Sequence, residues 1–82
     1  MARVLLVYDV VDDRKRGKVA DACKDYGLDR FQFSAFTGEL SRNHQEELML
    51  KVTALLDGCE ANVQLIAIEA AEWRKRLEVV NA

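Results

Sequence analysis

The sequence predicts an α+β domain in which one sheet carries two helices on one face, with elements in the order β-α-β-β-α-β and an extra β-ended tail. Three observations predict this fold class. Apolar runs of strand length lie near both ends of the chain, stretches with apolar residues at helical spacing separate them, and capping residues or glycines mark most boundaries. The 82 residues predict one domain, with a core over residues 1–69 and a tail over residues 70–82.

Composition limits the classes of protein. Half of the residues are hydrophobic and 32% are charged, which is typical of a globular chain and excludes intrinsic disorder. The net charge of −2 excludes a general polycation, so contacts with nucleic acid must come from local clusters or from a surface that several subunits assemble. Because so small a core is commonly supplemented by self-association, we expect an oligomer.

Localisation and cysteine chemistry follow from what the sequence lacks. Met1-Ala2-Arg3 leads directly into a strand-length apolar run, so we expect no signal peptide, and no apolar run reaches the length of a membrane span. Cys23 and Cys59 lie far apart, and His44 is the only histidine. We therefore expect reduced cysteines used for packing in a cytoplasmic protein, and a thiol-based enzyme is not indicated.

The first two elements are a strand and a helix. The apolar run inside Arg3–Tyr8 begins after one arginine and ends before an acid, which predicts a strand buried on both faces. Asp12 or Asp13 can cap the helix that follows, and Gly27 supplies its left-handed stop. The apolar stripe of this helix has the spacing i, i+3, i+4, i+7 and consists of Val19, Ala22, Cys23 and Tyr26.

The middle of the chain predicts β structure followed by a helix. Phe31–Phe36 alternates with period two and has a possible break near Ser34, so the stretch to Leu40 is either two short strands joined by a tight turn or bulge, or one bent strand. Ser41 is a good N-cap for a helix over about residues 42–56, which Asp57-Gly58 ends. Its apolar face consists of Leu48, Val52, Leu55 and Leu56.

The last third predicts a strand and a short tail. Asn62–Glu69 forms a strand with at least one buried face, residues 70–76 form one or two helical turns, and Leu77–Val80 forms a short last strand. Trp73 either anchors this tail or stacks on nucleic acid beside its basic neighbours. The complete order is the ferredoxin-like arrangement, which hosts enzymes, regulators and RNA-binding modules, so function must be argued from the site.

The chemistry concentrates where the first strand ends. Asp9 offers oxygen ligands for a hard divalent cation, and the basic cluster that follows can bind phosphates. This cluster consists of Arg14, Lys15, Arg16 and Lys18. Asp9 could instead be a cap or an ion-pair partner, and the basic cluster a solvated helix face. Tyr8 alternates with Asp9 and so points to the opposite sheet face, where core packing is its simplest role.

Several of these residues lie in segments that recur together in one known family. These segments are Tyr8-Asp9-Val10, Asp12-Asp13, Arg16 with Lys18, Tyr26-Gly27-Leu28-Asp29-Arg30 and Gln32-Phe33-Ser34-Ala35-Phe36. Through them, the first half of the chain resembles the Cas-two family, small CRISPR-associated proteins described as metal-dependent endonucleases and as the non-catalytic partner of the spacer integrase. The second half matches only in layout. Lys18 stands where the family often carries an arginine, which weakens the case for bidentate phosphate binding there.

The resemblance implies a homodimer whose two Asp9 carboxylates meet across the two-fold axis and hold Mg2+ or Mn2+, with Asp9 and Tyr8 catalytic. Its tail would pair with the partner subunit's sheet. The predicted nucleic-acid-binding residues are Arg14, Arg16, Lys18 and Arg30. Phe36 resembles a family position at the site, although a strand aromatic is commonly core, and Ser34 either hydrogen-bonds near the metal or shapes a bulge.

Two other functions stay open alongside an endonuclease that acts with the CRISPR integrase. The dimer could be a non-catalytic DNA-binding scaffold between integrase subunits, or an unrelated ferredoxin-like regulator that binds a small molecule between subunits. A toxin-like ribonuclease is a variant of the first function. Nothing in the sequence resembles a base-reading code, so sequence specificity is expected to be low, and RNA, single-stranded DNA and duplex DNA are all candidate substrates.

Overall fold

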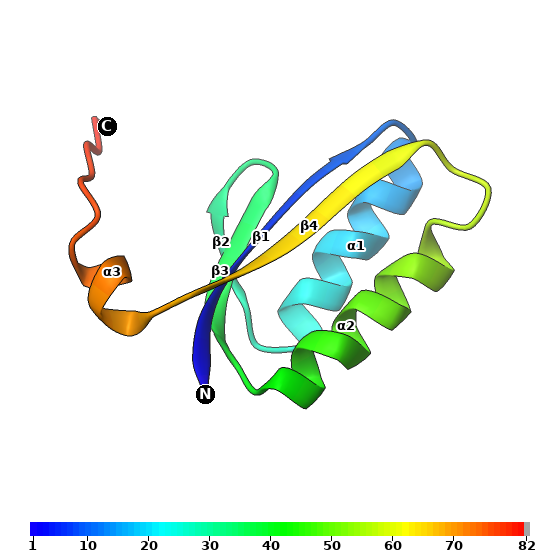
Figure 1. Ribbon diagram of the computed structural model, residues 1–82. Coiled ribbons are helices and arrows are strands. Elements are labelled where there is room, and N and C mark those ends of the chain that lie inside the picture. The colour runs from blue at the N-terminus through cyan, green and yellow to red at the C-terminus, as the bar shows by residue number, and fades with distance from the viewer. Residues whose placement is uncertain (82) are drawn as a thin grey trace.

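The computed structural model describes residues 1–81 as one antiparallel sheet of four strands, with α1 and α2 on one face and α3 on the other side (Figure 1). Its elements are β1 (Ala2–Val10), α1 (Asp13–Asp25), β2 (Asp29–Gln32), β3 (Ala35–Leu40), α2 (Arg42–Leu55), β4 (Ala61–Ile68) and α3 (Ala70–Arg74). The strand order β2-β3-β1-β4 confirms the ferredoxin-like arrangement. None of the helices in this part of the chain has the length and apolarity needed to cross a membrane.

β1 is central, and its two faces have different surroundings. One face, called the packed face, points at α1 and α2 and contributes the buried residues Val4, Leu6, Tyr8 and Val10. The opposite face, called the open face, carries Arg3, Leu5 and Val7, which are half-buried, and Asp9, which is exposed. The prediction of a strand buried on both faces is therefore wrong, because helices cover only one face of this antiparallel sheet.

α1 begins and ends where its sequence predicts. The Asp12 side chain accepts a hydrogen bond from the Lys15 amide at 2.9 Å, which satisfies one of the free N–H groups at the helix start. Gly27 follows the helix with φ of 84°, a left-handed conformation that glycine adopts without strain. The predicted stripe is buried except for Tyr26, which is half-buried. This stripe places α1 on the packed face of the sheet.

The stretch from Asp29 to Leu40 is a hairpin of two strands rather than one bent strand, with Phe33 and Ser34 in its connection. The pairing shifts register between Arg30 and Gln32, as expected of a bulge. β3 also approaches the segment after α1 closely: a Cβ added at Gly38 would lie 2.7 Å from Cδ2 of Leu28. The absence of a side chain at Gly38 thus permits this contact.

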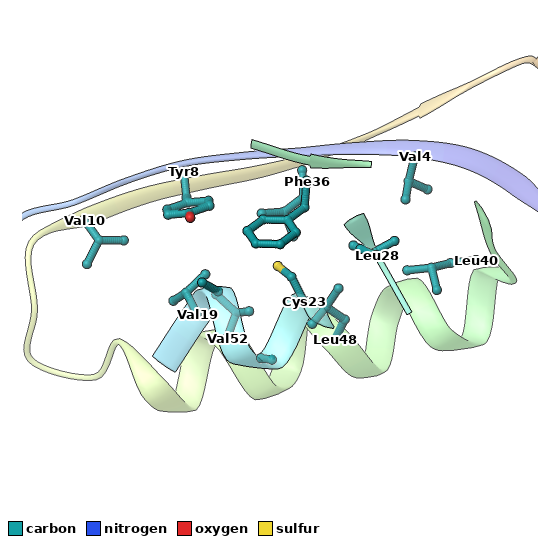
Figure 2. Packing of buried hydrophobic residues seen from close by; sticks show 13 residues of the cluster. Val4, Tyr8, Val10, Val19, Cys23, Leu28, Phe36, Leu40, Leu48 and Val52 are labelled. Atoms are coloured by element: carbon teal, nitrogen blue, oxygen red, sulfur yellow. The ribbon is translucent and has the colours of Figure 1, made fainter. Parts of the chain in front are cut away.

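α2 completes the core. Ser41 caps it by accepting a hydrogen bond from the His44 amide at 3.2 Å, as predicted. Leu48 and Val52 are buried against α1 and the sheet, with the Phe36 ring and the Cys23 thiol between the layers (Figure 2). The predicted apolar residues at the end of this helix, Leu55 and Leu56, are half-buried.

β4 and the tail are less buried than their sequences predict. β4 pairs only with β1 and forms one edge of the sheet, with Val63 and Leu65 half-buried and Ile66 exposed. After α3 the structure assigns no strand to residues 77–81, so the expected Leu77–Val80 strand does not form within a single chain, and its pairing with a partner subunit stays a prediction. Its apolar side chains lack a neighbouring strand there, and Leu77 is 99% exposed. Residue 82 of the predicted tail lies outside the described residues.

Candidate functional site

Asp9 lies one residue before the end of β1, on the open face and exposed to solvent. It pairs across the sheet with Asn62 of β4. The strand fixes its backbone through pairing to β4, while its carboxylate oxygens remain accessible. This position suits a ligand that a second molecule completes, because carboxylate oxygens suit hard divalent cations.

Tyr8 points to the other face, as the strand alternation predicts. Its ring lies against the Phe36 ring with 6.2 Å between centroids, inside the core (Figure 2). Its hydroxyl donates a hydrogen bond to the Phe33 carbonyl at 3.4 Å, and its amide donates to the Ser34 carbonyl at 3.0 Å. Tyr8 thus ties β1 to the β2–β3 connection, while Asp9 stands on the opposite side of the sheet.

Arg16 and Arg30 converge on one pocket although they are far apart in sequence. This hollow, here called the hairpin pocket, has a volume of about 220 Å³ and lies between α1 and the β2–β3 connection. Its lining residues are Tyr8, Asp13, Arg16, Gly17, Ala20, Arg30 and Phe33. Arg16 is paired there with Asp13, and the Arg30 guanidinium lies 4.9 Å from the centre of the Phe36 ring. Two cations therefore share a site that a phosphate could occupy.

The remaining predicted cations are distributed around the start of α1. Arg14 and Lys18 are exposed on the helix. Lys15 instead donates its ammonium group to the Asp57 carbonyl at 2.7 Å, across to the end of α2. This contact places a positive charge near the C-terminal end of α2, where it interacts favourably with the helix dipole. Lys15 thus has a structural role within the basic cluster.

Ser34 and Phe36 shape the site from within the fold. Ser34 is half-buried in the β2–β3 connection, where its carbonyl continues the pairing toward β1. Phe36 is fully buried, which agrees with the core role that aromatic residues on strands commonly have. Because its ring supports both Tyr8 and the Arg30 guanidinium, Phe36 positions two site residues without reaching the surface itself.

One copy of the chain does not provide all the ligands of a divalent-metal site. Residues 1–81 contain no group of three or more His, Cys, Asp or Glu side chains that could hold a metal ion. Asp9 supplies the right donor chemistry but only one carboxylate. Mg2+ is commonly bound through one or two carboxylates together with waters and substrate phosphate, so Asp9 fits such an ion when a second copy supplies its own Asp9.

Thiol chemistry is disfavoured at the buried cysteine. Cys23 is free and fully buried. Burial raises the pKa of the Cys23 thiol to about 11, although the nearby Arg30 charge acts in the opposite direction. The thiol is therefore protonated at neutral pH and behaves as a packing group, as the sequence predicted.

A larger hollow of about 570 Å³ lies at the other end of β1, beside α3, and contains none of the predicted site residues. Trp73 lines it and lies 5.6 Å from the Phe31 ring, measured between centroids. The Arg3 and Arg76 guanidinium groups lie 5.0 and 4.1 Å from the Trp73 ring. These contacts agree with the prediction that Trp73 anchors the tail.

Phe33 was missed as a site residue. The alternation of Phe31–Phe36 predicts a strand position for it, whereas the structure places it in the connection, 76% exposed at the rim of the hairpin pocket. The predicted break near Ser34 was the only signal available in the sequence, because it placed Phe33 next to a turn.

Comparison with known proteins gives a consistent result. The family model described as CRISPR associated protein Cas2 matches residues 1–76. A CRISPR-associated endoribonuclease Cas2 of Chloroflexus aurantiacus is 50% identical over 72 residues, covering 88% of this chain and 85% of that protein. A Cas1/Cas2 endonuclease fusion of Thermoproteus tenax is 33% identical over 66 residues, covering 80% of this chain and 25% of the fusion.

The fold comparison agrees. The crystal structure of a hypothetical protein from Thermus thermophilus superposes with a TM-score of 0.80 at 27% identity, covering 99% of this chain and 92% of that one. The family match covers nearly the whole chain and includes Tyr8, Asp9, Arg16 and Arg30. The resemblance noted in the first half of the sequence therefore extends into the second half, and the chain belongs to the CRISPR associated protein Cas2 family.

Proposed function

We propose that this chain forms a homodimeric, metal-dependent endonuclease that acts in spacer acquisition together with the CRISPR integrase. The observation that carries the proposal is the exposed Asp9 carboxylate near the end of a well-paired strand, on a sheet face that no helix of its own chain fully covers. The naming of the relatives as endoribonucleases and as a Cas1/Cas2 fusion supports the nuclease activity and the integrase partner. Such a protein would act in the cytoplasm.

The open face suits a second copy of the chain. Leu5 and Val7 are half-buried there and Ile66 is exposed, so self-association would bury further apolar surface. Since β4 is an edge strand and the tail has exposed apolar residues, the tail of one subunit can add a strand to the sheet of the other. These two contacts would bring the two Asp9 residues to one interface.

The residues then have separate roles in phosphodiester hydrolysis. Two Asp9 carboxylates would hold Mg2+ or Mn2+, which when bound would polarise the scissile phosphate and lower the pKa of an attacking water. Arg16 and Arg30 would bind phosphates of the nucleic-acid backbone. The exposed Arg14 and Lys18 would contact further phosphates along the same nucleic-acid strand. Tyr8 would position the β2–β3 connection, through its hydrogen bond to Phe33.

The test is cleavage of labelled RNA and duplex DNA with Mg2+ or with chelator, by the unaltered protein, Asp9→Asn and Asp21→Asn. Asp21 is an exposed acid on α1 and provides a matched control. We expect Asp9→Asn to lower the cleavage rate by at least about hundredfold, in the range typical of lost catalytic groups, while Asp21→Asn retains it. Cleavage that persists in Asp9→Asn or in chelator would contradict the proposed site.

A second function is favoured by one observation: Asp9 and the hairpin pocket lie on opposite faces of the sheet. Phosphate binding can therefore operate without chemistry at Asp9, as a DNA-binding scaffold for the integrase requires. If the chain is such a scaffold, the unaltered protein and Asp9→Asn both fail to cut nucleic acid and bind duplex DNA equally well, in a salt-sensitive manner. Arg16→Gln then binds the duplex more weakly.

A further inference from the structure

Phe33 is an exposed aromatic ring on a fixed backbone. Isolated exposed apolar side chains are normal on protein surfaces, so exposure alone indicates nothing. The Phe33 carbonyl, however, accepts hydrogen bonds from the Tyr8 hydroxyl at 3.4 Å and from Nη1 of Arg30 at 2.5 Å. The connection is thus held to β1 and to β2, and Phe33, a residue that is 76% exposed, extends from this anchored backbone.

The surroundings of Phe33 are cationic. Arg16 and Arg30 line the same hairpin pocket as Phe33, where Asp13 is the one acidic residue among the described lining residues. Arg30 is held in place by the Phe36 ring beneath it and by its bond to the Phe33 carbonyl. Arg16 pairs with Asp13, whose side chain is 94% exposed, and an ion pair so exposed contributes little to stability. An incoming phosphate can therefore replace the Asp13 carboxylate as the partner of Arg16.

An exposed phenylalanine that shares a pocket with two guanidinium groups matches the chemistry of an unpaired nucleotide. Proteins bind single strands by stacking bases on aromatic rings while cations contact the backbone. In an intact duplex the bases stack on one another, so the same surface would meet only phosphates.

We propose that Phe33 is a stacking platform for an unpaired nucleobase, with Arg16 and Arg30 on the adjacent phosphates. The inference rests on the proposed nucleic-acid function and specifies the form of its ligand: a single strand, or a strand frayed from a duplex end. The hairpin pocket would then distinguish single-stranded from double-stranded nucleic acid and would not read the base sequence.

The test compares Phe33→Leu, which removes the aromatic ring, with Phe33→Tyr, which keeps it. Leu50→Ala is the matched control, because Leu50 is 71% exposed on α2. The probe is a single-stranded oligonucleotide that contains 2-aminopurine, with its blunt duplex in parallel at one salt concentration. Stacking of 2-aminopurine on Phe33 should quench the fluorescence of that base. We expect Phe33→Leu to weaken single-strand binding about tenfold and to abolish this quenching, with duplex binding changed less than about twofold.

Phe33→Tyr and Leu50→Ala should bind both ligands like the unaltered protein. Equal binding of the single strand by Phe33→Leu and Phe33→Tyr would overturn the inference, as would equal losses for single strand and duplex. A change in oligomeric state caused by Phe33→Leu would assign the ring to subunit contact instead. Cleavage by Asp9→Asn, measured in parallel, separates the two proposals. If Phe33→Leu binds the single strand normally and Asp9→Asn loses cleavage, only the stacking role is rejected. If the unaltered protein neither binds nor cuts nucleic acid, both proposals are rejected.

Discussion

The packed and open faces of β1 differ in what completes them. On the packed face, α1 and α2 bury Val4, Leu6 and Tyr8 within the chain. On the open face, Leu5 and Val7 are only half-buried and Asp9 is exposed. The difference shows that the same strand performs two tasks: every second residue stabilises the domain, and the residues between them are available to another molecule. The proposed catalytic acid belongs to the second set and the tyrosine next to it to the first.

The largest expected effect compares neighbouring leucines on the two faces. Leu6→Ala removes a fully buried side chain and should lower the free energy of unfolding by about 2–5 kcal/mol. Leu5→Ala, on the half-buried open face, should cost about 1 kcal/mol or less. Urea unfolding followed by circular dichroism measures both. Equal costs would show that the open face is covered in solution as completely as the packed face.

A smaller effect is expected from glycines in different surroundings. Gly38→Ala would place a Cβ 2.7 Å from the Leu28 side chain, which is buried, and should cost about 1–3 kcal/mol through overpacking. Gly17 lies in α1 with open space around it, so Gly17→Ala should stabilise the protein by about 0.5–1 kcal/mol. Thermal unfolding of the two variants compares them directly. A destabilised Gly17→Ala variant would show that this side of α1 is covered.

The smallest effect concerns Asp12, the residue that caps α1 on the packed face. The hydrogen bond from the Lys15 amide lowers the pKa of the Asp12 carboxyl below its usual 3.8. A carboxyl with a lowered folded-state pKa stabilises the protein above the unfolded-state value, and this stabilisation is lost as the pH falls through the folded-state pKa. The advantage in Tm of the unaltered protein over Asp12→Asn should therefore shrink between pH 5 and pH 2. A difference that is independent of pH would contradict this role.

Most of the fold could be predicted because its signals are local. The caps at Asp12 and Ser41, the stop at Gly27 and the stripe of α1 each depend on neighbouring residues, and all were confirmed. The failures depend on distant contacts. The apolar run of β1 predicted burial on both faces, but only alternate residues of the run are buried, on the packed face. The strand expected at Leu77–Val80 has no neighbouring strand to pair with in its own chain.

The site divides in the same way. Strand alternation was sufficient to place Tyr8 and Asp9 on opposite faces. The meeting of Arg16 with Arg30 and Phe33 depends on how α1 packs against the hairpin, and no spacing in the sequence encodes that packing. The metal ligands, which would come from two chains, stay a prediction because one chain contributes a single Asp9 carboxylate.

The strand order β2-β3-β1-β4 has a consequence for synthesis of the chain. Of the four described strands, β1 is made before the others and lies inside the sheet, and its second neighbour β4 is made after the others, with Val10 paired to Ala61. At about 5–20 residues per second, roughly 3–10 s pass on the ribosome before β4 reaches β1. During that interval the edge of β1 that later pairs with β4 is open, while β3 can already pair with the other edge and α1 can cover the packed face.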